Sequence, residues 1–167
     1  FGSSVTEAVV LANAEFIAEH LLEFGWDTVV VDIDWSDPTA SAHEYNAGAP
    51  LEMDEYGRLV PAPNRFPSAA DCAGFGPFAE RIHALGLKFG IHTMRGVPRN
   101  AVAQATPVLG TSATAAEIAA SENSCQWNPD MVGLDWSNPA AQAYYDSTLA
   151  LYARWGVDFI KCDDMLW

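Results

Sequence analysis

Positively charged residues are scarce in this chain of 167 residues. It carries 8 Lys and Arg against 22 Asp and Glu, which gives a formal net charge of −14. A surface of this sign repels phosphate backbones and anionic lipid headgroups, so nucleic acids and membranes are poor candidate partners. The sequence also lacks any apolar run near the ~18 residues of a membrane span. The compartment (secreted, periplasmic or cytoplasmic) and the oligomeric state stay open.

Cysteines are equally few. The chain has three, Cys72, Cys125 and Cys162, with no CxxC pair, so they predict neither a disulfide scaffold nor a zinc site. No G-x-G-x-x-G or G-x-x-x-x-G-K-[ST] motif follows a predicted strand, which weakens a nucleotide-binding interpretation. The triplet "DID" (residues 32–34) could bind a divalent metal, but two carboxylates without a His-rich ligand set are a weak metal signal. We expect no cofactor and no resident metal.

A helix, a tight turn and a buried strand recur three times. The segments are "EFGWDTVVVDIDW", "ALGLKFGIHTM" and "RWGVDFIKCDD", and each places a Gly (Gly25, Gly86 or Gly156) directly before a short apolar run. Glycine suits the left-handed position that commonly ends a helix. The pattern therefore predicts three strands, each entered from a helix.

The helices that precede these glycines are visible in the sequence. Apolar spacing predicts the first over about residues 6–24, and the second is expected over about 77–85. For the third, Asn138 is a plausible N-cap and Pro139 a plausible first helical residue, and the helix should run up to Gly156.

Helices that alternate with buried strands predict an α/β fold with a parallel sheet. Long loops should follow the first strand (about 36–67) and the second (about 96–138), where barrels and doubly wound folds keep their sites. Without a nucleotide motif, a barrel is the better interpretation. An eight-fold β/α barrel usually needs roughly 250 residues, so we expect one incomplete barrel domain over residues 1–167.

Polar residues stand at the ends of the predicted strands. Asp32 and Asp34 share one face after the first strand, and Lys161 and Asp163 share one face of the third, because side chains alternate along a strand. We expect Lys161 to pair with Asp163, since an ammonium nearby favours the ionised carboxylate that a nucleophile needs. The alternative is a structural ion pair, with Asp32 and Asp34 as loop caps.

Further candidates flank these positions. His92 ends the second strand, and Arg95, just beyond it, must either reach a loop carboxylate or face the pocket. Trp35 and Trp127 could stack on a sugar or simply pack a loop. Cys162 alternates away from Lys161 and Asp163, so we expect a buried thiol packed against a helix.

Three stretches resemble glycoside hydrolase family 27, the α-galactosidases and related enzymes: "DEYGRLVPAPNRFPS" (54–68), "LGLKFGIHTM" (85–94) and "YARWGVDFIKCDD" (152–164). The last is similar to the family's fourth strand, which ends in a K-x-D motif. The resemblance implies a partial (β/α)8 TIM barrel, roughly its first four βα units with the first strand truncated. The domain, 1–167, would then be an incomplete catalytic TIM barrel.

The resemblance also implies roles. Asp163 would be the nucleophile of a retaining glycosidase acting on terminal α-galactosides or related α-glycosides, and the acid/base residue would lie outside this chain. The implied substrate-binding residues are Asp32, Asp34, Trp35, His92, Arg95 and Lys161. The sequence departs from the family where Ile33 separates the two aspartates and where His92 stands in place of a common Tyr. The cysteine that often follows the nucleophile motif is also absent, with Asp164 and Met165 there instead.

Two other interpretations compete with this one. The first is a carbohydrate-binding barrel that does not catalyse, and the second is metal-dependent sugar transfer through residues 32–34. The partial barrel also carries a physical expectation of its own, because unpaired strand edges and an uncovered sheet face favour aggregation. We therefore expect the isolated 167-residue chain to be poorly soluble.

Overall fold

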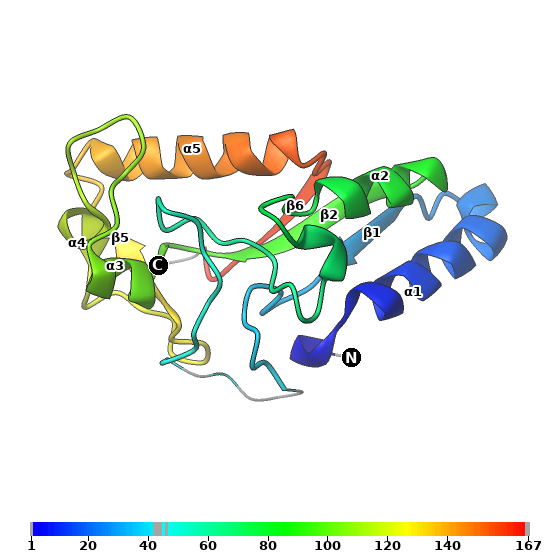
Figure 1. Ribbon diagram of the computed structural model, residues 1–167, viewed down its shortest axis with the longest axis horizontal. Coiled ribbons are helices and arrows are strands. Elements are labelled where there is room, and N and C mark those ends of the chain that lie inside the picture. Colours follow the sequence, from blue (N-terminus) through cyan, green and yellow to red (C-terminus); the bar gives the residue numbers. More distant parts are fainter. Residues whose placement is uncertain (1, 42–44, 46, 166–167) are drawn as a thin grey trace.

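The protein is an α/β structure built around a parallel sheet of three strands (Figure 1). The computed structural model describes residues 2–41, 45 and 47–165. The sheet has the order β1-β2-β6, with β1 at Thr28–Val31, β2 at Lys88–Met94 and β6 at Phe159–Asp163. Both neighbouring pairs are parallel, which confirms the predicted sheet.

Each of the three strands follows a helix, as the sequence predicts. Helix α1 (Glu7–His20) precedes β1, α2 (Gly76–Ala84) precedes β2, and α5 (Ala140–Arg154) precedes β6. Short 3-10 turns lie at Gly2–Ser4 (η1), Leu22–Phe24 (η2) and Pro67–Ala69 (η3). None of the helices in the described part of the chain is long and apolar enough to cross a membrane.

The three glycines adopt the predicted left-handed conformation, with φ of 89° at Gly25 and 80° at both Gly86 and Gly156. Helix α5 begins one residue later than predicted, at Ala140 with Pro139 at the N-cap position, although the Asn138 side-chain oxygen still accepts a hydrogen bond from the Ala140 N–H at 3.0 Å. The first helix is shorter than predicted: α1 ends at His20, and η2 replaces its last turn.

The segment after β2 is more ordered than the predicted loop. It contains β3 (Val97–Pro98), α3 (Arg99–Gln104), α4 (Ala115–Ile118), β4 (Ala119–Ala120) and β5 (Met131–Leu134). These strands form a small antiparallel sheet of order β3-β5-β4. Val97, Ile118 and Val132 pack in its own buried cluster, so apolar burial stabilises strands that are too short to show a period in the sequence.

The main core lies between the parallel sheet and its helices. Aromatic rings dominate it: Phe75 contacts Phe66, Phe89 and Trp155 with edge geometry at centroid distances of 5.2 to 6.0 Å. Val29, Val31, Phe89 and Ile91 bring the helix-facing side of β1 and β2 into the same cluster. The helices therefore cover one face of the sheet, and alternation places Lys161 and Asp163 on the other.

Candidate active site at the C-terminal ends of the parallel strands

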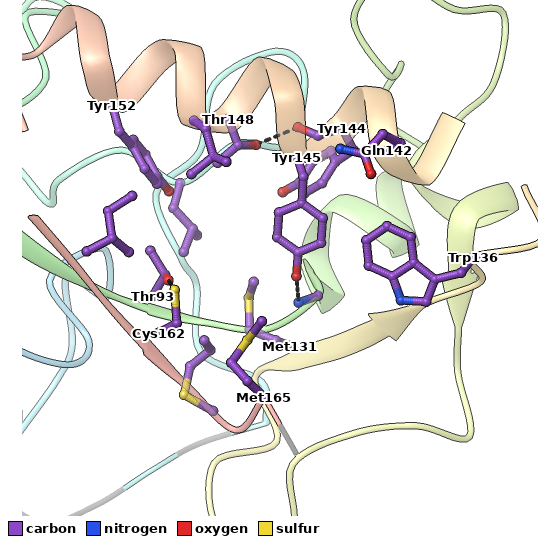
Figure 2. A pocket seen from close by; sticks show the side chains of 15 residues that line it. Thr93, Met131, Trp136, Gln142, Tyr144, Tyr145, Thr148, Tyr152, Cys162 and Met165 are labelled. Carbon is purple, nitrogen blue, oxygen red and sulfur yellow. Dashed lines mark hydrogen bonds between the residues drawn. The ribbon is translucent and has the colours of Figure 1, made fainter. Parts of the chain in front are cut away.

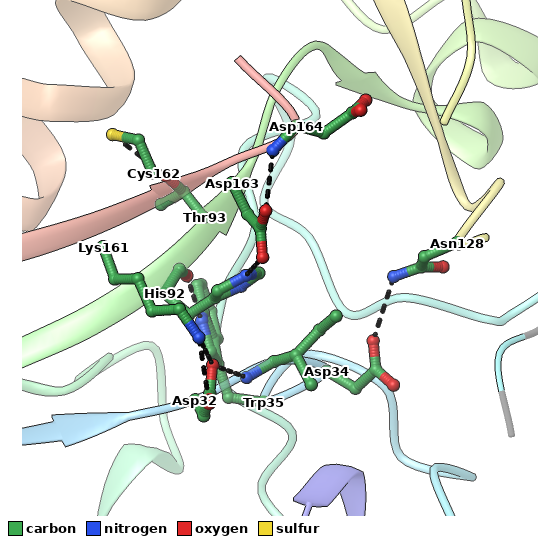
Figure 3. A network of polar contacts seen from close by, with 11 residues as sticks. Asp32, Asp34, Trp35, His92, Thr93, Asn128, Lys161, Cys162, Asp163 and Asp164 are labelled. Carbon is green, nitrogen blue, oxygen red and sulfur yellow. Dashed lines mark hydrogen bonds and ion pairs between the residues drawn. The ribbon is translucent and has the colours of Figure 1, made fainter. Parts of the chain in front are cut away.

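Four ionisable side chains gather on the face of the sheet opposite the helices (Figure 3). In the strand register His92 is paired with Lys161 and Met94 with Asp163, and Asp32 directly follows β1. Residues paired in a parallel ladder point to the same face, so the register alone brings His92, Lys161 and Asp163 together. The site lies where the strands end, as predicted.

Lys161 forms an ion pair with Asp32. Its Nζ lies 2.8 Å from Asp32 Oδ1 and 3.1 Å from Oδ2. The predicted pairing of Lys161 with Asp163 is therefore wrong. Asp163 is one step further along the same face, whereas the long lysine side chain reaches across β2 to the end of β1. Burial raises the pKa of Asp32, but the bonds from Lys161 and the Ile33 N–H lower it by more, so the carboxylate stays ionised.

Asp163 has different partners. Its Oδ1 accepts a hydrogen bond from the Asp164 N–H at 2.8 Å, and its Oδ2 lies 3.3 Å from Nε2 of His92. Burial raises the pKa of Asp163, but the Asp164 N–H, His92 and the charge of Lys161 together hold it below its usual value. Asp163 is thus an ionised, partly exposed carboxylate at a strand end, which is the state a nucleophile requires.

His92 is buried, with 2% of its surface exposed. Burial lowers the pKa of its imidazole, and the contact with Asp163 opposes that shift. A neutral ring that donates from Nε2 fits this position, and it orients the Asp163 carboxylate. A direct contact between His92 and substrate stays a prediction.

Asp34 stands apart from the Lys161 pair. Its backbone is left-handed (φ 61°), and its carbonyl accepts a 2.5 Å hydrogen bond from the buried Arg65 guanidinium, which fixes the loop after β1. Burial and the nearby charge of Asp37 raise the pKa of Asp34 to about 6. One carboxylate oxygen receives a long 3.4 Å hydrogen bond from the Asn128 amide.

Two further buried polar residues, Asn128 and Asp130, were not predicted from the sequence. Both are buried, and burial with the charge of Asp34 raises the pKa of Asp130 to about 7. Asn128 Oδ1 and Asp130 Oδ1 have no hydrogen-bond partner within the described structure. They come from the loop before β5, outside any predicted strand end, so the sequence carried no signal for them.

The structure shows the surroundings of three further candidates, Trp35, Arg95 and Cys162. Trp35 is only 2% exposed and donates from its indole N–H to the His92 carbonyl at 2.7 Å, so it packs the core and shows no open face to a sugar. Of the two alternatives for Arg95, the structure shows contact with a carboxylate. Its Nε lies 2.8 Å from Asp164 Oδ2 in a largely buried ion pair, and the two groups are not aligned as a hydrogen bond. Cys162 faces α5 as predicted, but its thiol is exposed and not packed.

The arrangement suits the binding and attack of a neutral polyol. Ionised Asp32 and Asp163 accept hydrogen bonds from hydroxyl groups, and Lys161 donates. Among the described residues, no group of three or more His, Cys, Asp and Glu side chains is arranged to hold a metal ion. Asp32 in "DID" already has Lys161 as its partner, and Asp34 contacts Asn128.

Comparisons with known proteins agree with this chemistry. The chain is 33% identical over 97 residues to α-galactosidase mel1 of Schizosaccharomyces pombe, which covers 58% of this chain and 18% of that protein. It is 28% identical over 158 residues to α-galactosidase 3 of Hypocrea jecorina, which covers 95% of this chain and 20% of that one. No family model matches the sequence.

A solved structure matches far more closely. The GH27 β-L-arabinopyranosidase from Geobacillus stearothermophilus shares 57% identity with a TM-score of 0.97, over 99% of this chain and 38% of that one. The relatives are thus glycosidases, and the chain spans only part of their length. Within that class, the chain is similar over nearly its whole length to enzymes of glycoside hydrolase family 27.

Proposed function

We propose that the complete protein containing this chain is a retaining glycoside hydrolase that removes terminal α-galactosyl residues or sugars of the same ring stereochemistry. A β-L-arabinopyranoside matches an α-D-galactoside around the ring and lacks only the hydroxymethyl group, so both are candidate substrates. The observation that carries the proposal is the convergence of Asp32, Lys161 and Asp163 on one sheet face at the strand ends.

The chain contributes part of a barrel in this proposal, roughly the first four βα units with the first strand truncated. Two features support it. The strands β1, β2 and β6 are parallel neighbours entered from helices, and those helices cover only one face. The polar site occupies the opposite face, which in a closed barrel is the interior at the carboxyl ends of the strands.

Asp163 acts as the nucleophile. One carboxylate oxygen attacks the anomeric carbon as the bond to the leaving oxygen breaks, and a carboxylic acid elsewhere in the complete protein gives that oxygen a proton. Water then attacks the same carbon and returns a proton to that group, and Asp163 is released. Such an acid/base residue would lie ~5–5.5 Å from Asp163, and we place it outside residues 1–167.

Lys161 and Asp32 bind hydroxyl groups of the reacting sugar. Their ion pair is half exposed, so a hydroxyl can share either partner without leaving a charge buried and unpaired. Asp34 completes this side of the site. With a pKa of about 6 it donates a hydrogen bond when protonated and only accepts above that pH.

The test uses the complete protein and Asp163→Gly, each with an activated α-galactoside and with the corresponding β-L-arabinopyranoside, with and without azide. We expect the variant to be inactive and azide to restore release of the leaving group, with a glycosyl azide of inverted anomeric configuration visible by NMR. Chelator should leave the wild-type rate unchanged, and loss of activity would favour metal-dependent transfer. A wild type that binds these sugars without hydrolysing either glycoside would favour the non-catalytic carbohydrate-binding alternative.

A further inference from the structure

A second cavity lies beside the candidate active site. It has a volume of about 320 Å³ and is lined by Arg95, Glu122, Asn123, Ser124, Gln126, Trp127 and Asp164. Small-molecule sites commonly have volumes of ~300–1,000 Å³. None of the proposed roles of Asp32, Lys161 and Asp163 uses this space.

The cavity is joined to the site through its floor. Asp164 lines the cavity, and its N–H donates to the Asp163 carboxylate at 2.8 Å. Arg95 comes directly after Met94, the register partner of Asp163, and its ion pair with Asp164 is largely buried. The cavity therefore begins one residue beyond the proposed nucleophile, and the charges of Arg95 and Asp164 in its lining are already paired.

The wall is the loop between β4 and β5, and backbone contacts hold it in place. The Asn123 N–H donates to the Ala120 carbonyl at 2.8 Å, and the Asn123 carbonyl accepts from the Gly133 N–H at 2.5 Å. A Cβ at Gly133 would meet the Asn123 carbonyl oxygen at 2.9 Å, so the close approach requires glycine there. From the same loop, Asn128 reaches the Asp34 carboxylate.

The lining suits a neutral sugar ring. Trp127 is 47% exposed, and its indole is supported by an edge contact with Tyr45 at 5.3 Å and 73°. The negative face of an aromatic ring attracts the weakly positive C–H face of a pyranose. In the part of the chain that the structure describes, the side chains of Glu122, Ser124 and Gln126 make no hydrogen bond or ion pair within the protein, so they are free for hydroxyl groups.

Tyr45, which contacts Trp127, is also affected by the charges of the candidate active site. Burial raises the pKa of its phenol, and the charges of Asp34, Asp32 and Asp163 add to the shift. The ring of Tyr45 contacts Trp127, which lines the second cavity.

We propose that this cavity is the subsite for the leaving-group sugar, with Trp127 as its stacking platform and Gln126 as a hydrogen-bonding residue. This proposal rests on the proposed glycosidase function. It extends that function by naming the residues that bind the leaving-group sugar. It predicts that the enzyme prefers a sugar as leaving group over a small one.

The test compares two substrates that share the reacting sugar in the complete protein. One is a disaccharide with an α-1,6-linked galactosyl or the corresponding arabinopyranosyl residue, and the other is the glycosyl fluoride, which has no leaving-group sugar. Trp127→Ala should lower kcat/KM for the disaccharide by roughly 10-fold to 100-fold, from ~1–3 kcal/mol of lost contacts, and change it for the fluoride by less than about twofold. Trp127→Phe should recover most of the loss, and Gln126→Ala should show a smaller loss on the disaccharide alone.

Trp26→Ala is the matched control. Trp26 is 68% exposed and precedes β1, at the opposite ends of the strands, so neither substrate should respond. An equal loss on both substrates in Trp127→Ala would overturn the subsite, and so would no loss on either.

Failure of the proposed function gives a separate result. If the wild type cleaves neither substrate, calorimetric titration with the disaccharide decides the binding role. Weaker binding by Trp127→Ala than by the wild type and Trp26→Ala supports a sugar subsite, and equal binding by all three overturns it.

Discussion

The two faces of strand β6 differ sharply in chemistry. On one face, Lys161 and Asp163 meet Asp32 and His92 in a network of charged contacts. On the other, Ile160 and Cys162 line an apolar groove of about 280 Å³ beneath α5, together with residues such as Tyr145, Tyr152 and Met165 (Figure 2). Alternation of side chains along five residues is enough to separate a site of ionised groups from an apolar surface.

The difference shows how each face handles its polar atoms. On the site face each charge has a partner yet stays reachable, since Lys161, Asp32 and Asp163 are all partly exposed. On the groove face the polar atoms are few, and the Tyr145 hydroxyl is occupied by the Gly96 N–H at 2.6 Å. A polar substrate can exchange hydrogen bonds on the first face, whereas the second offers mainly apolar contact.

The largest expected effect comes from removing the nucleophile on one face and leaving the other intact. Asp163→Asn in the complete protein should lower kcat by roughly 10³-fold or more, because an amide cannot form the glycosyl ester, while sugar affinity by titration stays within a few-fold. Cys162→Ala, one residue away on the groove face, should keep kcat within about twofold. Similar losses in both variants would show that the two faces are not functionally separate.

The next largest effect is expected on the stability of the fold, from the buried carboxyl group of Asp130. The pKa of Asp130 is raised to about 7, so its contribution to stability is present below pH ~3.8 and lost as pH rises through about 7. Asp130→Asn should therefore be more stable than the wild type at pH 8, by about 1–4 kcal/mol, with the difference shrinking toward pH 4. Urea unfolding across this pH range measures it.

Asp135→Asn is a control in which the stability difference from the wild type should depend on pH in the opposite direction. The Ser137 side chain and N–H lower the pKa of this exposed carboxylate, so it contributes stability above its ordinary pKa that is lost as pH falls. The Asn variant should lose stability relative to the wild type at neutral pH and not at acid pH. A matching pH trend in the two variants would contradict the assignment of Asp130 as a buried acid.

The smallest effect is expected from Lys161→Met, which tests whether the Lys161 charge binds substrate or only stabilises the surface. Lys161→Met leaves Asp32 without its cation, and kcat/KM should fall roughly 10-fold from the loss of one charged hydrogen bond to substrate. The unfolding free energy should change by less than about 1 kcal/mol, because exposed ion pairs contribute little. Steady-state kinetics and urea unfolding give both values.

Lys88→Met is the matched control for that variant. Lys88 makes a similar exposed ion pair with Asp27 at 2.7 Å, but it begins β2, at the end of the sheet opposite the site. Its stability change should resemble that of Lys161→Met, with no change in kcat/KM. Equal kinetic losses would indicate that Lys161 acts through the fold and not through substrate.

Local signals made much of the fold predictable. A glycine that ends a helix before an apolar run is a short-range feature, and Gly25, Gly86 and Gly156 adopt the predicted backbone conformation. The faces of Asp32, Lys161 and Asp163 followed from a period of two. The antiparallel sheet at β3 to β5 was missed, because its strands of two to four residues have no period to detect.

Partners across the sheet were harder to predict than positions along a strand. Lys161 was assigned to Asp163 on the same strand, yet a lysine side chain is long enough to reach Asp32 two strands away. The position of Trp35 beside two aspartates suggested that its ring stacks on a sugar. In the structure the Trp35 ring packs in the core, against Phe75 and Tyr152. Cys162 was expected to pack, and it is exposed because α5 and β6 leave a groove between them.

Trapping the glycosyl-enzyme tests the central claim most directly. The complete wild-type protein would be incubated with a fluorinated glycosyl fluoride whose sugar attaches faster than water removes it, and then analysed by intact mass and peptide mapping. We predict one added sugar per chain, on the peptide that contains Asp163, and no addition in Asp163→Asn. A sugar on another carboxylate, or turnover of ordinary glycosides with no trapped adduct on Asp163, would contradict the assignment of Asp163 as the nucleophile.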